Sequence, residues 1–278
     1  MKKILAIISS PRKLGNSEIM VKEISRNISE PHELQLLRLS DFSILPCIGC
    51  YMCLVKNKGC VLKDDFNMLA EKIIDADALI VAAPTYFLGV NSCLKRFSDR
   101  GLALYPHAEK LWGKPAVGVG IAGIPGKEGS TLLGIESFIK LVLADMKQVR
   151  LIYGALPGEI FLNNENRDTA RQLASALFEP APEKHKSSCP LCGGKTFRFL
   201  GQDKVQCMLC SNMGTMTIQD NIPGFDIQKS EHELFLSLEE VIEHREWLLN
   251  MKSRFLKHKD ELKKISLDYR KQGEWIKP

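Results

Sequence analysis

The first 178 residues alternate short runs rich in apolar residues with stretches of helical periodicity. The apolar runs predict five strands, at residues 4–8, 33–39, 78–83, 116–122 and 149–156. Helical patterns start at Ser17 and cover residues 65–75, 91–104, 130–146 and 167–178. Strands that alternate with helices predict an α/β fold with a doubly wound, five-stranded parallel sheet. In such a sheet the ligand lies beyond the carboxyl ends of the strands.

The pattern changes after residue 178, which divides the chain into three predicted parts. Residues 1–178 form the α/β domain, and Glu179-Pro180-Ala181-Pro182 is typical of a linker. The linker opens a second part, residues 179–228, which contains a small cysteine-rich domain. Residues 229–278 form a helical segment, in which Ser237 and Glu240 predict a capping box. The apolar face of this segment comprises Leu238, Val241, Ile242, Leu248, Leu249, Phe255 and Leu256.

Composition and charge place the chain among globular proteins of the cytoplasm. Hydrophobic residues make up 45% and charged residues 26% of the 278 positions. The apolar run at the start is too short for a signal peptide, and no stretch is long enough to cross a bilayer, so no membrane partner is expected. The net charge of +5 resides largely in residues 252–278. Because the chain shows no aromatic platform or base-reading pattern, nucleic acid is not an expected partner.

Residues 9–17 follow the first predicted strand and open a helix, so they are placed to bind an anion. The free N–H groups and the positive dipole end of a helix N-terminus both favour a phosphate. Small hydroxyl residues such as Ser10 and Ser17 let the backbone close around it, together with Asn16. Arg12 adds a charge-assisted hydrogen bond.

This loop resembles the phosphate loop of the NAD(P)H-dependent FMN reductases and multimeric flavodoxins, although Ser9 replaces the usual glycine. Segments 84–100 and 120–123 carry the same resemblance. It implies a flavodoxin-like domain in which the loop binds the phosphate of FMN and the other segments border the flavin ring. The implied contacts are Ser10, Arg12, Asn16 and Ser17 for the phosphate, and Pro84, Thr85, Tyr86, Phe87, Gly89 and Gly123 for the ring. Plain core packing is the alternative for Tyr86 and Phe87.

Eight of the nine cysteines form two groups, which indicates metal ligands in a chain without an export signal. In the first group, Cys47, Cys50 and Cys53 are spaced to bind three corners of a cubane cluster, with Cys60 as the fourth ligand. This motif resembles that of the iron–sulfur flavoproteins and implies a [4Fe–4S] cluster. Free or disulfide-forming thiols are the alternative.

The second group predicts a metal ribbon. Cys189 and Cys192 form one knuckle, and Cys207 and Cys210 form another after fourteen residues. Two such knuckles bind a metal tetrahedrally, so the ribbon holds zinc or, as in rubredoxin, iron. Neither the remaining cysteine, Cys93, nor the six histidines have ligand-like spacing.

These features predict an FMN-dependent oxidoreductase that takes electrons from NAD(P)H or a reduced carrier. The electrons pass to a small acceptor such as a quinone or free flavin, or leave through the cluster. The alternative is an iron–sulfur flavoprotein electron carrier that is reduced by ferredoxin and has no substrate site of its own. A third hypothesis is a redox-sensing module that contacts nucleic acid. The resemblance also implies a homo-oligomer.

Overall fold

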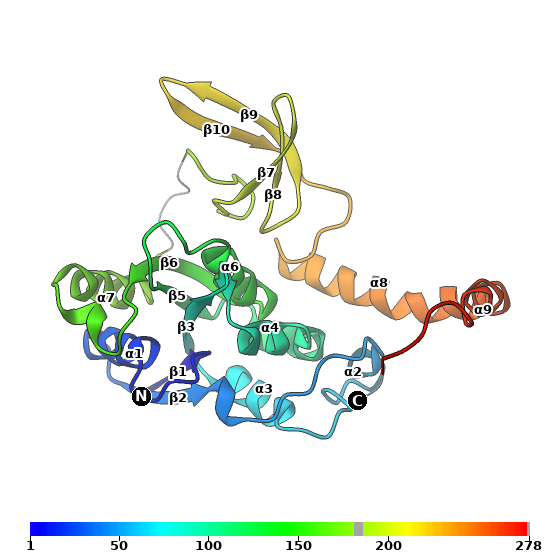
Figure 1. The fold of residues 1–278 in the computed structure, drawn as a ribbon, viewed down its shortest axis with the longest axis horizontal. Coiled ribbons are helices and arrows are strands. Elements are labelled where there is room, and N and C mark those ends of the chain that lie inside the picture. Colours follow the sequence, from blue (N-terminus) through cyan, green and yellow to red (C-terminus); the bar gives the residue numbers. More distant parts are fainter. Residues whose placement is uncertain (181–185, 277–278) are drawn as a thin grey trace.

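The computed structural model describes residues 1–180 and 186–276, which form two sheets and a helical arm (Figure 1). The larger sheet is built from the first part of the chain, and the smaller one from the cysteine-rich part. Residues 181–185 lie outside the described residues. The linker expected there, which includes Ala181 and Pro182, therefore stays a prediction.

Five parallel strands build the larger sheet in the order β2-β1-β3-β5-β6. They are β1 (Lys2–Ile8), β2 (His32–Arg38), β3 (Ala78–Tyr86), β5 (Pro115–Ala122) and β6 (Asp145–Tyr153). The strand order reverses between β1 and β3, which is the point where open α/β sheets bind their ligands. The predicted flavodoxin-like parallel sheet is therefore confirmed.

A sixth short strand, which the sequence pattern did not predict, joins the five parallel strands. Strand β4 (Gly89–Val90) folds back on β3 and pairs with it antiparallel, with Tyr86 opposite Gly89. Phe87 and Leu88 form the turn at φ values of 47° and 62°. Two central residues with positive φ suit a two-residue hairpin, but bulky side chains rarely adopt this conformation. The usual glycine or asparagine signal of such a turn is missing here, so the sequence pattern did not indicate it.

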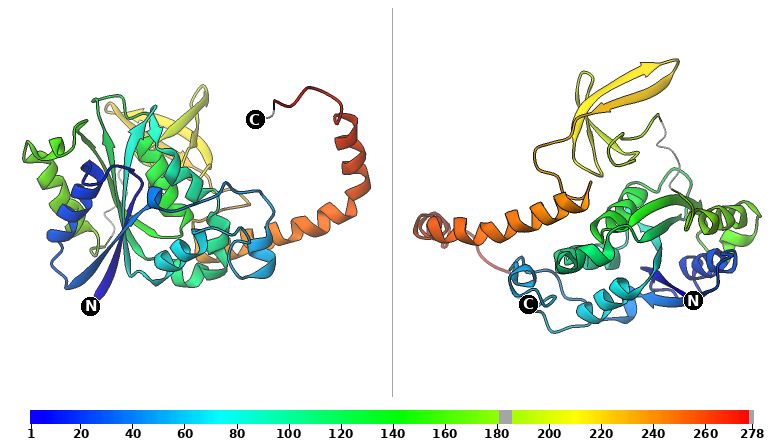
Figure 2. Two further views of the ribbon diagram at one scale, coloured as in Figure 1. Left: turned by 60° about the horizontal axis from the view of Figure 1, so that its bottom comes forward. Right: turned by 180° about the vertical axis from the view of Figure 1, so that it is seen from behind.

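Helices cover both faces of the larger sheet, as Figure 2 shows from two sides. Helices α1 (Asn16–Arg26) and α7 (Glu165–Ala176) pack on one face. The opposite face carries α3 (Phe66–Asp75), α4 (Ser92–Ser98) and α6 (Thr131–Leu141). Shorter elements are η1 (Leu39–Asp41), α2 (Met52–Lys56), η2 (Gly101–His107), α5 (Ala108–Leu111) and η3 (Glu159–Phe161).

Side chains of β1 alternate between two hydrophobic cores. Ile4 and Ile8 pack into the core beneath α1 and α7, whereas Leu5 and Ile7 pack into the core on the other face. Each of these side chains is at most 2% exposed. Fully burying one such side chain contributes about 1.5–3 kcal/mol. The sheet is thus fixed from both sides, and its carboxyl ends hold the functional loops in place.

Two helices end earlier than the sequence pattern predicts. Helix α6 stops at Leu141, because Leu143 adopts a φ of 62° and the N–H of Asp145 pairs with the oxygen of Lys114, where β6 begins. The helix predicted for residues 91–104 is α4 followed by the 3₁₀ helix η2, which contains Pro106. Proline removes a backbone donor and limits regular helix at that point.

The smaller sheet is antiparallel and has the order β10-β9-β8-β7. Its strands are β7 (Phe197–Gly201), β8 (Lys204–Cys207), β9 (Met213–Gln219) and β10 (Ile222–Ile227). The first two lie between the two cysteine knuckles, where the apolar and β-branched residues of 196–200 and 204–206 favour short strands. The hairpin of β9 and β10 was not predicted, although Asp220 and Asn221 form its turn at φ values of 52° and 61°. In Figure 1 this sheet lies above α6 and β6.

The helical segment contains α8 (Leu238–Lys257) and α9 (Lys259–Asp268). The predicted capping box is confirmed, since the backbone N–H groups of Ser237 and Glu240 each donate to the other residue's side chain, at 3.0 Å and 3.3 Å. Val241 and Leu248 are buried, whereas Phe255 and Leu256 are more than half exposed. The arm thus packs at its start and then extends away from the body (Figures 1 and 2). No helix among the described residues combines the length and apolarity that crossing a membrane requires.

Candidate functional site

A cavity of about 220 Å³ lies at the carboxyl ends of β1, β3, β5 and β6. The loop after β1, the end of β3 and the segments following β5 and β6 surround it. Its lining comprises Ser10, Arg12, Asn16, Ser17, Pro84, Thr85, Tyr86, Ile121, Gly123, Gly154 and Ala155. The cavity is therefore at the place where the strand order predicts a ligand.

Eight of the ten residues predicted to contact FMN line this cavity. Phe87 and Gly89 do not: the Phe87 side chain is fully exposed, and Gly89 lies in the β3–β4 hairpin facing Ser130. Ile121 belongs to segment 120–123, which the resemblance places beside the ring, whereas Gly154 and Ala155 were not predicted. Their position at the ends of predicted strands was the signal that would have found them.

Asn16 and Arg12 join the loop after β1 to the loop after β6. Asn16 donates from Nδ2 to the oxygen of Gly154 at 2.9 Å and accepts from the N–H of Gly158 at 2.9 Å. Arg12 donates from Nη1 to the oxygen of Ala155 at 3.2 Å. A side chain at Gly154 would meet Ile160 at 2.6 Å, so only glycine allows this approach. Both loops are thus held at the edge of the cavity.

The N-terminus of α1 fits a phosphate. Its N-cap residue is Gly15, which has no side chain to cap the first turn. The helix dipole and the N–H groups of the first turn, apart from that of Glu18, which donates to the Gly15 oxygen, therefore remain available to an anion. Ser10 and Ser17, which line the cavity beside them, add hydroxyl donors, and Arg12 adds a cation. This donor set suits the phosphate that the sequence predicts here.

Glu18 supports this loop from behind. Its carboxylate accepts from the N–H of Leu14 at 2.8 Å and pairs with Lys22 at 2.7 Å and Arg38 at 2.5 Å. Burial on its own would raise the pKa of Glu18, but the hydrogen bonds of these three partners lower it overall. The charge of Glu18 is thus balanced by two cations, and it holds the loop without opposing an anion in the cavity.

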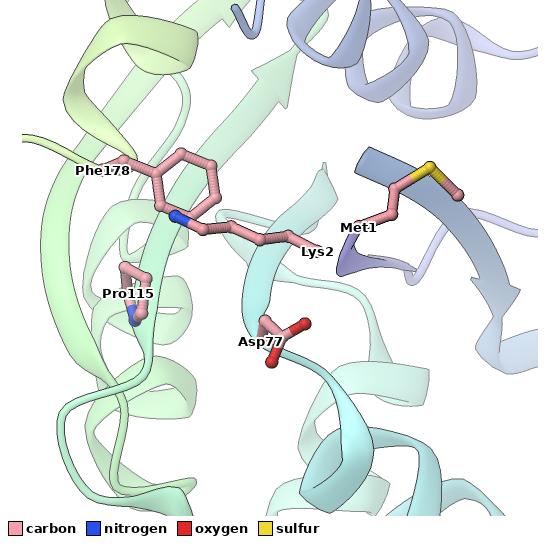
Figure 3. Close-up of a pocket in the computed structure, with 5 residues that line it drawn as sticks. All are labelled: Met1, Lys2, Asp77, Pro115 and Phe178. Atoms are coloured by element: carbon pink, nitrogen blue, oxygen red, sulfur yellow. The ribbon is translucent and has the colours of Figure 1, made fainter. Parts of the chain in front are cut away.

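A larger cavity, about 310 Å³, lies at the opposite end of the sheet (Figure 3). Met1, Lys2, Asp77, Pro115 and Phe178 line it. The ammonium group of Lys2 lies 3.8 Å from the centre of the Phe178 ring, and the Asp77 carboxylate accepts from the backbone N–H of Lys3 at 2.7 Å. These contacts fix the amino ends of the strands, where doubly wound folds do not bind their ligands.

The first cysteine group lies in the loop between β2 and α3. Cys47 and Cys50 are exposed, whereas Cys53 on α2 and Cys60 are half-buried. Burial raises the pKa of the Cys53 thiol, and the charges of Cys60 and Cys50 raise it further. The N–H of Gly49 points at the Cys47 sulfur at 3.5 Å.

One buried arginine lies beside this group. The guanidinium of Arg100 lies near Cys60, and its buried Nε has no hydrogen-bond acceptor among the described residues. A buried N–H without an acceptor is costly. The structure does not gather the four sulfurs of this group as it gathers those of the second group, so the cluster stays a proposal.

The second cysteine group forms a compact four-sulfur site. All four sulfurs are buried and lie within 4.8 Å of one another. Cys189 and Cys210 are 3.8 Å apart, and Cys192 and Cys207 are 3.5 Å apart, between sulfurs. A tetrahedral ion with metal–sulfur bonds of about 2.3 Å needs sulfurs about 3.8 Å apart. In the parts of the chain that the structure describes, no other group of three or more His, Cys, Asp or Glu gathers in this way.

The knuckle backbone explains this geometry. Gly193 has a φ of 79° and Ser211 a φ of 64°, and each donates its N–H to the oxygen of the first cysteine of its knuckle. Gly194 donates its N–H to the Cys192 sulfur at 3.4 Å. Any side chain at Gly194 would meet Leu209 at 2.9 Å, so this position needs glycine.

One cluster of aromatic and histidine side chains was not predicted from the sequence. His232 and His244 form a hydrogen bond of 2.8 Å between their rings, next to Trp247. His244 also packs edge-on against Tyr105 of η2. Twelve residues separate the two histidines in sequence, so spacing gave no signal. The cluster joins α8 to the larger domain.

Comparison of the sequence with known proteins gives consistent matches. Residues 2–153 match the NADPH-dependent FMN reductase family. An iron-sulfur flavoprotein of Methanocaldococcus jannaschii is 31% identical over 189 residues, which cover 64% of this chain and 96% of that protein. An iron-sulfur flavoprotein of Archaeoglobus fulgidus is also 31% identical, over 66% of this chain and 82% of that one.

Two further matches extend into the cysteine-rich part. A flavone synthase of Aspergillus candidus is 25% identical over 244 residues, covering 74% of each chain. Among solved structures, a flavone reductase superposes with a TM-score of 0.72 at 19% identity and covers 99% of both chains. The whole arrangement of larger domain, ribbon and helical arm is thus a fold that occurs in another protein.

Proposed function

Since this chain belongs to the NADPH-dependent FMN reductase family, together with the iron-sulfur flavoproteins, and is an FMN-dependent oxidoreductase, we propose a specific route for its electrons. NAD(P)H or a reduced carrier protein supplies them to FMN. They leave through a [4Fe–4S] cluster at Cys47, Cys50, Cys53 and Cys60, or pass directly to a small acceptor such as a quinone or free flavin.

The cavity at the carboxyl ends of the strands carries this proposal. Eight residues proposed for FMN converge there from three separate segments, namely the start of α1 with the loop before it, the end of β3 and the loop after β5. Ser10, Arg12, Asn16 and Ser17 bind the phosphate, and Arg12 supplies the positive charge. Pro84, Thr85, Tyr86 and Gly123 border the ring, and Tyr86 is 43% exposed, so it is accessible to a bound ring.

When bound, FMN accepts electrons as a pair and releases them singly. The chain's own part is to orient the ring, to hold its phosphate and to set its potential. Thr85 contributes to this rigidity, since its hydroxyl pairs with that of Thr131 at 2.8 Å and joins the end of β3 to α6.

The ribbon has a structural role in this proposal. Cys189, Cys192, Cys207 and Cys210 bind one zinc ion, which holds the small sheet together and keeps it against the larger domain. Iron in the same site would make the ribbon an additional electron relay.

Anaerobic purification of the full chain, followed by absorbance spectra and analysis of iron, sulfide and zinc, tests the proposal. We expect bound FMN, four irons with four sulfides per chain as in a [4Fe–4S] cluster, and one zinc. Steady-state assays with NADH and NADPH then identify the donor. A chain that binds no FMN even when the nucleotide is added would sink the proposal.

A second candidate is an electron carrier without a substrate site. The exposure of Cys47 and Cys50 favours it, because a cluster at the surface exchanges electrons with a protein partner. For such a carrier we expect negligible NAD(P)H oxidation and rapid reduction of the protein by ferredoxin. NAD(P)H oxidation with turnover of a quinone would reject it.

A further inference from the structure

The helical arm leaves large apolar side chains uncovered. Phe255 and Leu256, at the end of α8, are each more than half exposed. Within α9, all of which the structure describes, no side chain is buried, and Leu262 and Ile265 are 42% and 51% exposed. The arm extends away from the body, so the chain itself does not cover them (Figure 2). Because an unpacked helix of ten residues is marginal in water, this run of apolar side chains marks a surface that another molecule covers.

One row of apolar side chains follows a single side of α8. Trp247, Met251 and Phe255 are spaced by four residues, so they lie one above another along the helix. Trp247 is 45% exposed, and Met251 is partly exposed. The ring of His244 stacks on that of Trp247, with ring centres 5.9 Å apart, and supports it from the side of the body. The row is therefore a preformed apolar seam that a second helix can cover.

The charge of α8 reverses along its length. Its first ten residues contain four glutamates and one arginine, a net charge of −3, and its last ten contain three cations and no acid, a net charge of +3. Glu243 and Glu246 are exposed in the first half, and Arg254 and Lys257 in the second. This order suits the dipole of the helix itself. It also makes α8 complementary to a copy of itself that runs the opposite way, whereas a parallel copy would place like charges together.

We propose that α8 pairs antiparallel with α8 of a second copy of this chain, about a two-fold axis near Met251. A two-fold contact uses the same surface on both copies, so the row Trp247, Met251 and Phe255 covers its own counterpart. The acidic half of each α8 then lies beside the basic half of the other. A nucleic acid or an anionic membrane would be repelled by the acidic half, so a second copy fits the whole helix better. The arm lies outside residues 2–153, so this contact is separate from the fold shared with the FMN reductase family.

Analytical ultracentrifugation of the purified full chain over a range of concentrations tests this pairing. We expect an association step whose dissociation constant rises about tenfold or more in the double variant Glu243→Lys, Glu246→Lys, because exposed pairs that attracted each other now repel. Added salt should weaken the same step in the wild type, since it screens exposed charges. Glu33→Lys with Glu71→Lys changes the net charge equally at exposed positions of the larger domain and is the matched control.

A mixture of two variants identifies the occupant as a second copy. Arg254→Glu with Lys257→Glu makes the basic half of α8 acidic and should weaken self-association to a similar extent. Mixed with the variant Glu243→Lys, Glu246→Lys, it pairs an acidic arm with a basic one, so the mixture should associate at least as tightly as the wild type. Circular dichroism of each variant checks that the helix is retained.

Phe255→Ala decides the question if a charge variant loses helix, because so exposed a side chain adds little to the fold of the single chain. We expect its dissociation constant to rise about tenfold, and Phe199→Ala, at an exposed position of β7, to leave it unchanged. A wild type without an association step, a step that none of these variants changes, or mixed variants that stay apart would each overturn the proposal. Binding of a monomeric wild type to anionic phospholipid vesicles would assign the arm to a membrane and overturn it as well.

Discussion

Arg12 supplies the positive charge of the proposed phosphate site. A charge-assisted hydrogen bond contributes about 1.5–3 kcal/mol, so Arg12→Gln should weaken FMN binding about tenfold to a hundredfold. Riboflavin lacks the phosphate, so its affinity should stay nearly the same. Fluorescence titration of both flavins measures the difference. The exposed neighbour Lys13, which does not line the cavity, provides the control Lys13→Gln. Equal losses for FMN and riboflavin would place Arg12 elsewhere than at the phosphate.

Glu136 is a buried carboxyl on α6 whose pKa burial raises to about 7, while the charge of Lys195 in the cysteine-rich part opposes the rise. The folded state therefore holds a proton that the unfolded chain releases near pH 4.5. Stability from this group is complete below pH 4.5 and is lost as the pH rises through about 7, a change of roughly 3 kcal/mol.

Urea unfolding at several pH values between about 5 and about 8 measures the slope of the free energy of unfolding against pH. Glu136→Gln should remove it, because the amide carries no charge at any of these values. Glu109→Gln, at an exposed position, should leave the slope as in the wild type. A slope that survives in Glu136→Gln would mean that another group titrates.

The residues that the sequence could place are those that follow strands directly. Ser10 and Gly123 each follow an apolar run closely. Because the strands are parallel, both residues lie at the carboxyl edge of the sheet. Arg100 differs, because its partner Asp64 and the neighbouring Cys60 are about forty residues away in sequence. Only the packing of α4 and η2 against the cysteine loop brings them together, and no periodicity encodes that contact.

Among the strands and helices, continuous apolar runs were predicted well, because burial on both faces leaves a clear pattern. The hairpin of β9 and β10 was missed, since its strands carry exposed residues such as Ile218 and Ile222 beside polar ones. The end of α6 was placed too late, because a leucine in the left-handed conformation leaves no mark in the sequence. Left-handed residues at helix ends and in turns are thus what the sequence pattern could not predict.

The ribbon sheet should depend on its metal. Its four strands surround few buried side chains, and a sheet this small seldom holds together without a metal or disulfide. Cys210→Ser removes one ligand, so we expect loss of the ion and of hydrogen-exchange protection in β7 to β10. The amides of β1 and β3 should stay protected. Cys93→Ser, outside both groups, is the control. Protection of the ribbon that survives metal loss would contradict this role.

One of the two hydrophobic cores extends through all three parts of the chain. The core on the α6 face continues into the ribbon through Val205 and Leu209 and into α8 through Val241 and Leu248. The lining of the FMN cavity, by contrast, lies wholly between positions 10 and 155. The iron-sulfur flavoprotein of M. jannaschii is matched over 96% of its length by 64% of this chain, so the family fold exists without this extension.

A fragment of residues 1–178 should therefore bind FMN within about threefold of the full chain and yet be less stable. Uncovering even two large side chains on the α6 face costs about 3 kcal/mol or more, at about 1.5–3 kcal/mol each. Urea unfolding and FMN titration of both proteins measure the two quantities separately. Equal stability would show that the ribbon and α8 rest on the larger domain without supporting it. A fragment that folds but does not bind FMN would instead show that the extension shapes the cavity from a distance.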